Sequence, residues 1–346
     1  METKLKIQQA IATITGGGSL GREEARMVMD EIMEGEATHA QIGSLVTALR
    51  MKGETSEEIT GFAESMRSRA NRVETEQFDL LDTCGTGGDG ANTFNISTAS
   101  ALVAAAGGIR VAKHGNRAMS SKSGSADVLE ALGVNIHLDG AQASRCLDQI
   151  GICFLFAMSY HQSMKHAAAP RRELGIRTVF NLLGPLTNPA GADRQLLGVF
   201  DRSKTELIAE VLHALKLRRG MVVASYDGLD EISISAPTQV TELKNSAIRT
   251  YEISPDELGL GTYTMNDVAG GDAQTNAEII EAILHGSRGA HRDIVLANAG
   301  ACFYVSERCS TLQEGVKLAA AVIDSKRAAD KLRELVQCTG AFSHVS

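Results

Sequence analysis

The chain has 346 residues, of which 43% are hydrophobic, and a formal net charge of -8 at pH 7. This length exceeds the usual size of a single domain, so we expect two domains with a sizeable core. The acidic balance, the absence of Trp and an aromatic content of 4% argue against a general nucleic-acid-binding or anionic-membrane surface.

The cysteine pattern and the N-terminal residues bear on the compartment. The six cysteines include no Cys-X-X-Cys pair, and the first residues carry no apolar run long enough for a signal peptide or a membrane span. Reduced thiols without such a segment are typical of cytoplasmic proteins. We therefore expect a cytoplasmic protein that does not insert into a membrane.

Residues 5–70 have helical spacing throughout. Apolar residues recur at i, i+3, i+4 and i+7 from Ile42, which places them on one helix face. Two helix starts carry capping boxes, whose first residues are Thr38 and Thr55. The pattern predicts a small all-helical domain over residues 1–71, and nothing in it indicates chemistry.

A short apolar run at 78–81 leads directly into a glycine-rich loop and then a helix. Glycine lets a ligand approach the backbone amides, and a helix N-terminus presents unpaired N–H groups, so this pattern suits a phosphate. The alternative is a mobile turn before a capped helix, which the number of polar residues disfavours. The loop matches neither a Walker loop nor a dinucleotide fingerprint, which argues against an ATPase and a dehydrogenase. Its candidate ligands are Gly85, Gly87, Gly88, Asp89, Gly90, Thr93, Asn95, Ser97 and Thr98.

Strand-like and helical segments alternate after this loop. Such alternation predicts an α/β domain with a largely parallel sheet, in which ligands bind beyond the carboxyl ends of the strands. We expect strands at 109–112, 134–137, 153–156, 197–200 and 221–225, and helices at 126–132, 141–150 and 204–217. A hairpin is expected within 239–253, and further helices at 276–284 and 311–336.

A second polar loop follows the strand at 109–112. Positive charge gathers there among serines, which suits a polyanion, although a solvated surface loop is the alternative. A position at a strand end favours the anion site. A lone histidine such as His114 is more often structural than catalytic. The cations are Arg110, Lys113, Arg117 and Lys122.

Asp230 and Glu231 follow the strand at 221–225 and offer hard oxygen ligands. Alone, such a pair is more often solvated turn charge, but two phosphate-suited loops in the same domain make it a candidate Mg²⁺ site. Arg171 or Arg172 could bind a substrate carboxylate through a planar guanidinium. Without further information, both are read as surface arginines.

Five motifs in order resemble the anthranilate phosphoribosyltransferase family over essentially the whole chain. They are GTGGD at 85–89, TFNIST at 93–98, KHGNR at 113–117, RRELGIRTVFNLLGPLTNP at 171–189 and DGLDE at 227–231. The resemblance implies a nucleoside-phosphorylase-like fold, with a small all-helical domain and a large α/β domain that has a mostly parallel central sheet. It implies that residues 1–71 are joined in the helical domain by about 168–194. Residues 72–167 and 195–346 then form the phosphoribosyl-binding domain, usually in a homodimer.

The resemblance also implies an activity and a site. A phosphoribosyl group would pass from phosphoribosyl pyrophosphate (PRPP) to the amino group of anthranilate, as in tryptophan biosynthesis, with Mg²⁺ as cofactor. The residues implied to bind PRPP are Gly85, Gly88, Asp89, Thr93, Asn95, Ile96, Ser97, Thr98, Lys113, His114, Gly115, Asn116, Arg117, Ala118, Met119, Ser120, Ser121 and Ser125. Gly85, Asn116 and Arg171 are implied to bind anthranilate, and Ser97, Asp230 and Glu231 to bind Mg²⁺.

Two other functions are weighed against this one. A pyrimidine nucleoside phosphorylase shares the architecture, but the acidic pair and the GTGGD motif favour PRPP over free phosphate. A non-enzymatic relative that binds nucleic acid is disfavoured by the acidic composition and the scarcity of aromatic residues. The chain departs from the usual family pattern at His161–Met164 and at Ser225–Tyr226.

Overall fold

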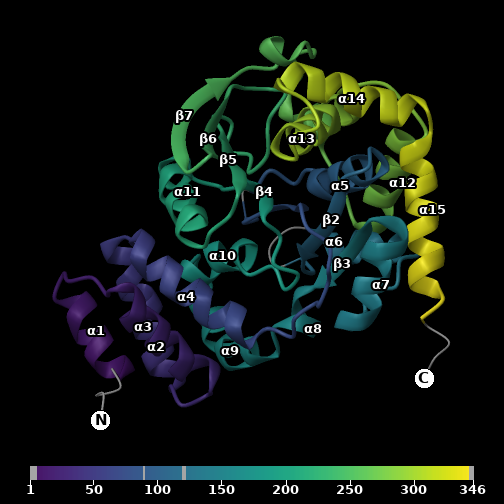
Figure 1. Cartoon of the computed structure of the whole chain (residues 1–346). Coiled ribbons are helices and arrows are strands. Elements are labelled where there is room, and N and C mark those ends of the chain that lie inside the picture. The colour runs from purple at the N-terminus through teal and green to yellow at the C-terminus, as the bar shows by residue number, and fades with distance from the viewer. Residues whose placement is uncertain (1–5, 89, 119–121, 343–346) are drawn as a thin grey trace.

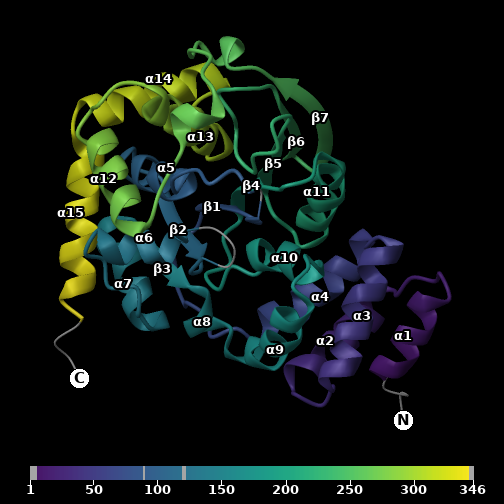
Figure 2. The same cartoon turned by 180° about the vertical axis from the view of Figure 1, so that it is seen from behind.

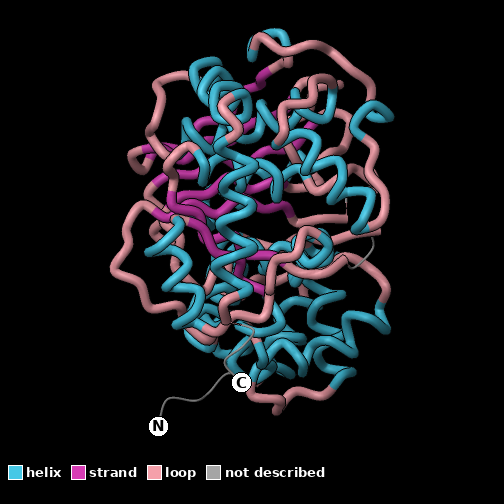
Figure 3. The backbone as a smooth tube through the Cα atoms, turned by 90° about the vertical axis from the view of Figure 1, so that its right-hand side faces the viewer, coloured by secondary structure: helices cyan, strands magenta, loops and turns pink. Residues whose placement is uncertain are grey.

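The structure is a computed structural model that describes residues 6–88, 90–118 and 122–342. A small helical bundle lies against a larger α/β part (Figure 1). From the side, strands occur only in the larger part, whereas the opposite end of the molecule consists of helices and loops (Figure 3). This arrangement confirms the predicted fold class.

Four helices form the N-terminal bundle, and the starts of the third and fourth carry the two predicted caps. Thr38 and Thr55 accept hydrogen bonds from the amides of Gln41 and Glu58, and both glutamine and glutamate side chains bond back to the cap amides. These reciprocal bonds satisfy two first-turn amides at each helix. The helices are α1 (Ile7–Thr15), α2 (Arg22–Met33), α3 (His39–Lys52) and α4 (Ser56–Arg69).

A later part of the chain returns to this bundle. Helix α9 (Lys165–Leu174) contacts α2 and α3, and α10 (Val179–Leu183) contacts α3 and α4. Ala167 of α9 and Leu182 and Leu183 of α10 lie in the same apolar core as the bundle. Assignment of about 168–194 to a helical domain stays a prediction, since contacts alone do not fix a domain boundary.

The α/β part is built on a seven-stranded sheet of order β3-β2-β1-β4-β5-β6-β7. The first five strands are mutually parallel, while β6 and β7 form an antiparallel hairpin at one edge. The predicted hairpin is therefore confirmed. The strands are β1 (Leu80–Gly85), β2 (Arg110–Gly115), β3 (Ile152–Phe156), β4 (Arg194–Gly198), β5 (Arg219–Ser225), β6 (Thr238–Lys244) and β7 (Ala247–Ile253).

Helices cover both faces of the sheet. Met221 and Val223 of β5 join the core beneath one helical layer, whereas Val222 between them joins the core shared with the bundle. This alternation is the two-residue period of a strand. The first layer contains α5 (Ile96–Ala106), α12 (Ala273–Leu284), α13 (Ala290–Val305), α14 (Leu312–Asp324) and α15 (Arg327–Gly340), which Figure 2 shows from behind. The second contains α7 (Gly140–Ile150), α10 and α11 (Thr205–Ala214).

Three expectations are wrong in detail. Residues 134–137 form no strand, because the amide of Asn135 donates to Thr339 Oγ1 of α15 at 3.1 Å instead of joining the sheet. The expected helix at 311–336 is two helices, separated where Lys326 adopts a φ of 67°. The expected loop at 113–117 begins later, since Lys113 and His114 belong to β2.

Within the described residues, no helix combines the length and the apolar character needed to cross a lipid bilayer.

Candidate active site

The glycine loop connects the end of β1 to the start of α5. Gly87 and Gly88 have φ values of 67° and 76°, in the left-handed region that other residues rarely adopt. The amide of Thr86 donates to the carbonyl of Gly198 at 2.9 Å, which anchors the loop to the end of the neighbouring strand β4. The loop therefore lies at the carboxyl edge of the sheet, as expected.

Asp230 is held directly against this loop. The amide of Gly87 donates to Asp230 Oδ2 at 2.7 Å, across 143 residues of sequence. A Cβ atom at Gly85 would collide with the Asp230 carboxylate, and one at Gly198 would collide with its backbone carbonyl. Asp230 and Glu231 are each 8% exposed. Glycine at both strand ends is thus what allows the acidic pair to approach the loop.

Lys113 places a positive charge beneath the start of α5. Its side chain is only 3% exposed, and Nζ donates to the carbonyl of Thr83 at 2.7 Å and to Ser97 Oγ at 3.3 Å. Ser97 lies in the first turn of α5, whose N-terminus adds a partial positive charge. The first loop, the end of β2 and the acidic pair after β5 are therefore brought together.

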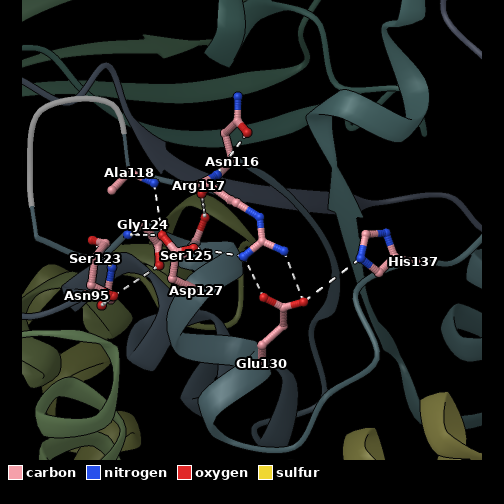
Figure 4. Close-up of polar contacts among 10 residues, drawn as sticks. All are labelled: Asn95, Asn116, Arg117, Ala118, Ser123, Gly124, Ser125, Asp127, Glu130 and His137. Carbon is pink, nitrogen blue, oxygen red and sulfur yellow. Dashed lines mark hydrogen bonds and ion pairs between the residues drawn. The ribbon is translucent and has the colours of Figure 1, made fainter.

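The predicted cluster of four cations is not formed, because two of its members lie at different places on β2 and the other two follow the strand. Arg110 begins the strand, at the edge opposite the glycine loop, and Lys113 is buried near its end. Arg117 turns back to α6 (Ser125–Ala131) and pairs with Asp127 and Glu130, as Figure 4 shows. The charge of Arg117 is therefore neutralised within the protein.

Carboxylate and amide side chains hold the second loop in shape. The amides of Ala118 and Gly124 both donate to Asp127 Oδ2 at 2.9 Å, which draws the two sides of the loop together. In Figure 4 the side chain of Asn116 points away from these carboxylates. Ser125 Oγ donates to the carbonyl of Asn116 at 3.3 Å. The side chain of Asn116 is therefore directed away from the carboxylates of α6 that hold the loop.

Asn95 joins three segments that are far apart in sequence. Its Nδ2 donates to the carbonyl of Ser123, and its Oδ1 accepts from Asn276 Nδ2 at 3.0 Å. Asn276 in turn accepts the amide of Gly271 at 2.7 Å. Thr93 forms a bridge with Ala269 in the same region. Asn95 and Thr93 thus fix the loops to one another.

The ring of His114 lies in the interior beneath the loop. Burial and the nearby His161 lower the pKa of His114 to about 3, and the two ring centres are 5.1 Å apart. Burial also lowers the pKa of His161 to about 4. A contact of His114 with a ligand at the loops is therefore restricted to its backbone. Thr98 is likewise buried, at 1% exposure.

Asp82 and Asn188 are interior residues that the sequence patterns did not single out. The carboxylate of Asp82 accepts the amide of His114 at 3.1 Å and Asn188 Nδ2 at 2.9 Å. Asn188 Nδ2 also donates to the carbonyl of Ala112 at 2.7 Å. Burial raises the pKa of Asp82 to about 6. The sequence signal that could have identified Asp82 is a carboxylate within an otherwise apolar strand.

Two arginines, Arg171 and Arg177, lie on the bundle side of the candidate site. Arg171, in the last turn of α9, is half-buried, and burial lowers its pKa. Its guanidinium lies 5.3 Å from the ring centre of Phe180, and no ion pair of Arg171 is present in the described part of the chain. It is thus a partly desolvated cation, which the expectation of a surface arginine missed.

Arg177 is a further residue that the sequence reasoning missed, although it lies within the fourth motif. Its guanidinium carbon is 4.3 Å from the ring centre of Phe200, just after β4. A Cβ atom at Gly88 would lie 2.9 Å from Arg177 Nε, so the guanidinium rests on the glycine loop. The segment between α9 and α10 therefore reaches the predicted phosphate site.

Four of the residues implied to bind PRPP, Asp89, Met119, Ser120 and Ser121, lie outside the described residues. Within the ranges that are described, no group of three or more His, Cys, Asp or Glu side chains is arranged to hold a metal ion. The implied Mg²⁺ set is of another kind, since it combines two carboxylates with the hydroxyl of Ser97.

Comparisons with known proteins agree with this geometry. Residues 77–329 match a family model described as the α/β domain of a glycosyl transferase family, and residues 8–70 match its helical bundle domain. The anthranilate phosphoribosyltransferase of Acetivibrio thermocellus is 53% identical over 336 residues, which cover 97% of each chain. That of Brevibacillus brevis is 54% identical over 337 residues, covering 97% of this chain and 99% of the relative.

Solved structures show the same relationship. The anthranilate phosphoribosyltransferase of Thermus thermophilus superposes with a TM-score of 0.91 at 42% identity, covering 96% of this chain and 99% of that one. The Saccharomyces cerevisiae enzyme in complex with PRPP and Mg gives a TM-score of 0.90 at 26% identity, covering 97% and 98%. The chain therefore belongs to the anthranilate phosphoribosyltransferase family.

Proposed function

We propose that the protein transfers the phosphoribosyl group of PRPP to the amino nitrogen of anthranilate, a reaction of tryptophan biosynthesis. The products are N-(5-phosphoribosyl)anthranilate and pyrophosphate. The observation that carries the proposal is the hydrogen bond from the Gly87 amide to Asp230 Oδ2, which unites a phosphate-suited loop with an acidic pair. Relatives at about half identity over nearly the full length bear the same name.

The leaving group determines where catalysis is needed. When pyrophosphate departs, negative charge grows on its oxygens and positive charge on the ribose carbon, so groups that neutralise the leaving oxygens lower the barrier. The N-terminus of α5 and the buried ammonium of Lys113 supply fixed positive potential at this edge. Their cost of reorganisation is small because the fold already holds them.

The acidic pair and Ser97 fit magnesium. All three offer hard oxygen donors, and the glycines at 85 and 198 leave the space that lets Asp230 reach the loop. Ser97, Asp230 and Glu231 would hold Mg²⁺, with water and diphosphate oxygens completing its shell. Bound there, the ion would supply charge neutralisation to the leaving diphosphate.

The attacking amine needs placement more than activation. An aromatic amine is neutral at pH 7 and loses its proton after bonding has begun, so no strong base is required. We assign the anthranilate carboxylate to Arg171, whose planar guanidinium is partly desolvated. Asn116 would orient the ring system through its amide, and the backbone at Gly85 would border it. These contacts bring the nitrogen toward the reacting carbon.

Arg177 is assigned to the diphosphate. Its guanidinium rests on Gly88 and stacks on Phe200, so the charge is held at the loop by two neighbours. A planar guanidinium can bind two phosphate oxygens at once. Because Arg171 lies in the last turn of α9 and Arg177 lies between α9 and α10, the bundle side of the site would contact both substrates.

We further propose that the protein works in the cytoplasm as a homodimer, as its resemblance to the family implies. Light scattering after size-exclusion chromatography should give twice the mass of one chain. A mass of one chain at micromolar concentration would contradict the dimer without affecting the proposed reaction.

The proposed reaction is tested by mixing the purified protein with PRPP, Mg²⁺ and anthranilate and following the loss of anthranilate fluorescence. The signal should fall only when all three are present, and pyrophosphate should appear in equal amount. Thymidine and uridine with phosphate serve as the comparison substrates. Nucleoside cleavage without any loss of anthranilate would reject the transferase in favour of a phosphorylase.

A further inference from the structure

Two thiols far apart in sequence meet where the last helix of the chain lies against α7. Cys146 belongs to α7 and Cys338 to the last turn of α15, and their Sγ atoms are 3.2 Å apart across 192 residues. Both views of the molecule show the two helices side by side (Figures 1 and 2). Cys146 is buried and Cys338 is partly exposed, and both are free thiols. One thiol can therefore be reached from solvent while the other stands behind it.

Neighbouring contacts hold the pair in register. Lys331 Nζ of α15 donates to the carbonyl of Ile150 at the end of α7, at 2.8 Å. On the other side, the amide of Asn135 donates to Thr339 Oγ1 at 3.1 Å, one residue from Cys338. A disulfide bond is about 2.0 Å long, so the sulfur atoms need to approach by only about 1 Å. Rotation of the two side chains with a small helix shift can supply this movement.

We propose that Cys146 and Cys338 are a site of reversible disulfide formation by exchange with a low-molecular-weight disulfide such as oxidised glutathione. The thiolate of Cys338 attacks one sulfur of the small disulfide, forms a mixed disulfide and releases one small thiolate. The Cys146 thiol gives its proton to the released small thiolate. The Cys146 thiolate so formed then attacks the Cys338 sulfur and expels the second small thiolate, which takes a proton from solvent. Two protein thiols are oxidised and one disulfide is reduced to two thiols.

The bond would fasten the end of the chain. Terminal helices fray unless they are tied down, and Cys338 lies in the last turn of α15. A cross-link between residues this far apart also removes many conformations from the unfolded chain, which favours the folded state. Neither cysteine belongs to the candidate active site, so the inference is independent of the proposed function.

The pairing is tested directly on the wild-type, full-length protein. After equilibration with excess oxidised glutathione, remaining thiols are alkylated and the protein is digested without reductant for mass spectrometry. A cross-linked peptide pair that contains Cys146 and Cys338, and that disappears on reduction, is expected. A glutathione adduct that persists on Cys338, a bond from Cys146 to the nearby buried Cys153, or alkylation of both thiols would overturn the proposal.

Thermal unfolding gives a second, independent measurement. The oxidised protein should unfold at a temperature higher than the reduced protein by on the order of 5 °C. Cys338→Ser should abolish this difference, whereas Cys309→Ser, which replaces the other partly exposed cysteine, should retain it. An equal redox-dependent shift in Cys338→Ser would overturn the proposal even if that variant were itself less stable.

Discussion

At the scale of single residues, the candidate site depends on where charge is neutralised inside the protein and where it is left for a ligand. Arg117 is engaged by Asp127 and Glu130, and Lys113 is buried against Thr83 and Ser97. Arg171 is partly desolvated by burial, without an ion pair in the part of the chain that the structure describes. A desolvated cation gains most from a charged partner, which is why we assign the substrate carboxylate to Arg171 and not to Arg117 or Lys113.

Arg171 and Arg177 should affect different substrates. Arg171→Ala should raise the KM for anthranilate about tenfold or more and change the KM for PRPP little, because a charge-assisted pair contributes roughly 1.5–3 kcal/mol. Arg177→Ala should show the reverse. Steady-state kinetics with each substrate varied in turn measures both. Arg172→Ala, an exposed neighbour of Arg171, is the control and should resemble the wild type. Equal losses for both substrates in either variant would contradict its assignment.

The acidic pair should determine the magnesium requirement. Asp230→Asn combined with Glu231→Gln keeps the shape of both side chains but removes their charge. The Mg²⁺ concentration needed for half-maximal turnover should therefore rise about tenfold or more. Glu252→Gln alters an exposed carboxylate that contacts Tyr226, shortly before the acidic pair, and should leave the magnesium requirement unchanged. An unchanged magnesium titration in the double variant would reject the metal role.

At the scale of elements, β2 and the segment after α8 (Ala157–Tyr160) press two histidines together in the interior. Burial lowers the pKa of both rings, to about 3 for His114 and about 4 for His161. Each is neutral in the folded protein at pH values where the unfolded chain, with a histidine pKa near 6.5, is already protonated. Their contribution to stability is therefore complete above about pH 6.5 and falls as the pH is lowered toward 4.

Asp82 has the opposite effect on the pH dependence of stability from that of the two histidines. Its pKa is raised to about 6, so between about pH 4 and 6 the folded protein binds a proton there that the unfolded chain has lost. This contribution is present at low pH and is lost as the pH rises through 6. The effect of Asp82 cancels that of one of the two histidines. Over this pH range the free energy of unfolding therefore changes by the equivalent of about one proton, or roughly 1.4 kcal/mol per pH unit.

His161→Gln should reduce the loss of stability in acid. Between about pH 4 and 6, its free energy of unfolding should fall with decreasing pH less steeply than that of the wild type, by about 1.4 kcal/mol per pH unit. Urea titrations across this range measure the slope. Removal of His161 also relieves the charge repulsion that lowers the pKa of His114, which acts in the same direction. His39→Gln, on the exposed start of α3, is the control, and equal slopes in wild type and His161→Gln would contradict the account.

At the scale of the whole molecule, the bundle completes one layer of the α/β part. Leu197 of β4, Val222 of β5 and Ile208 of α11 share a single apolar core with side chains of α2 and α4. Helix α4 contacts α11 and α10 directly. The segment that carries Arg171 and Arg177 is therefore positioned by this shared core.

A fragment of residues 72–346 should fail to fold on its own into the native state. Removal of the bundle exposes the apolar surfaces of α10 and α11, a loss of burial worth on the order of 1.5–3 kcal/mol for each large side chain uncovered. We expect a broad urea transition and strong binding of a hydrophobic dye. A sharp, cooperative transition near that of the full chain would show that the α/β part is an independent unit.

The sequence by itself determined the elements and the chemistry of the loops, because these depend on neighbouring residues. The caps at Thr38 and Thr55, the left-handed glycines at 87 and 88 and the hairpin at residues 238–253 follow from local rules of side-chain bonding and backbone sterics. The five motifs then identified the family. Residues 134–137 were misread because their apolar alternation reflects a contact with α15, which local spacing does not reveal.

Only the tertiary structure decided which side chains of the loops meet one another and which are buried or paired elsewhere. Lys113 and His114 are adjacent in one strand, yet one reaches Ser97 while the other is buried beside His161. Arg117 is satisfied by α6, Arg177 lies on Gly88, and Cys146 meets Cys338 across the fold. These outcomes depend on contacts between segments up to 192 residues apart, and the free energy of such contacts is fixed by the assembled core rather than by neighbours along the chain.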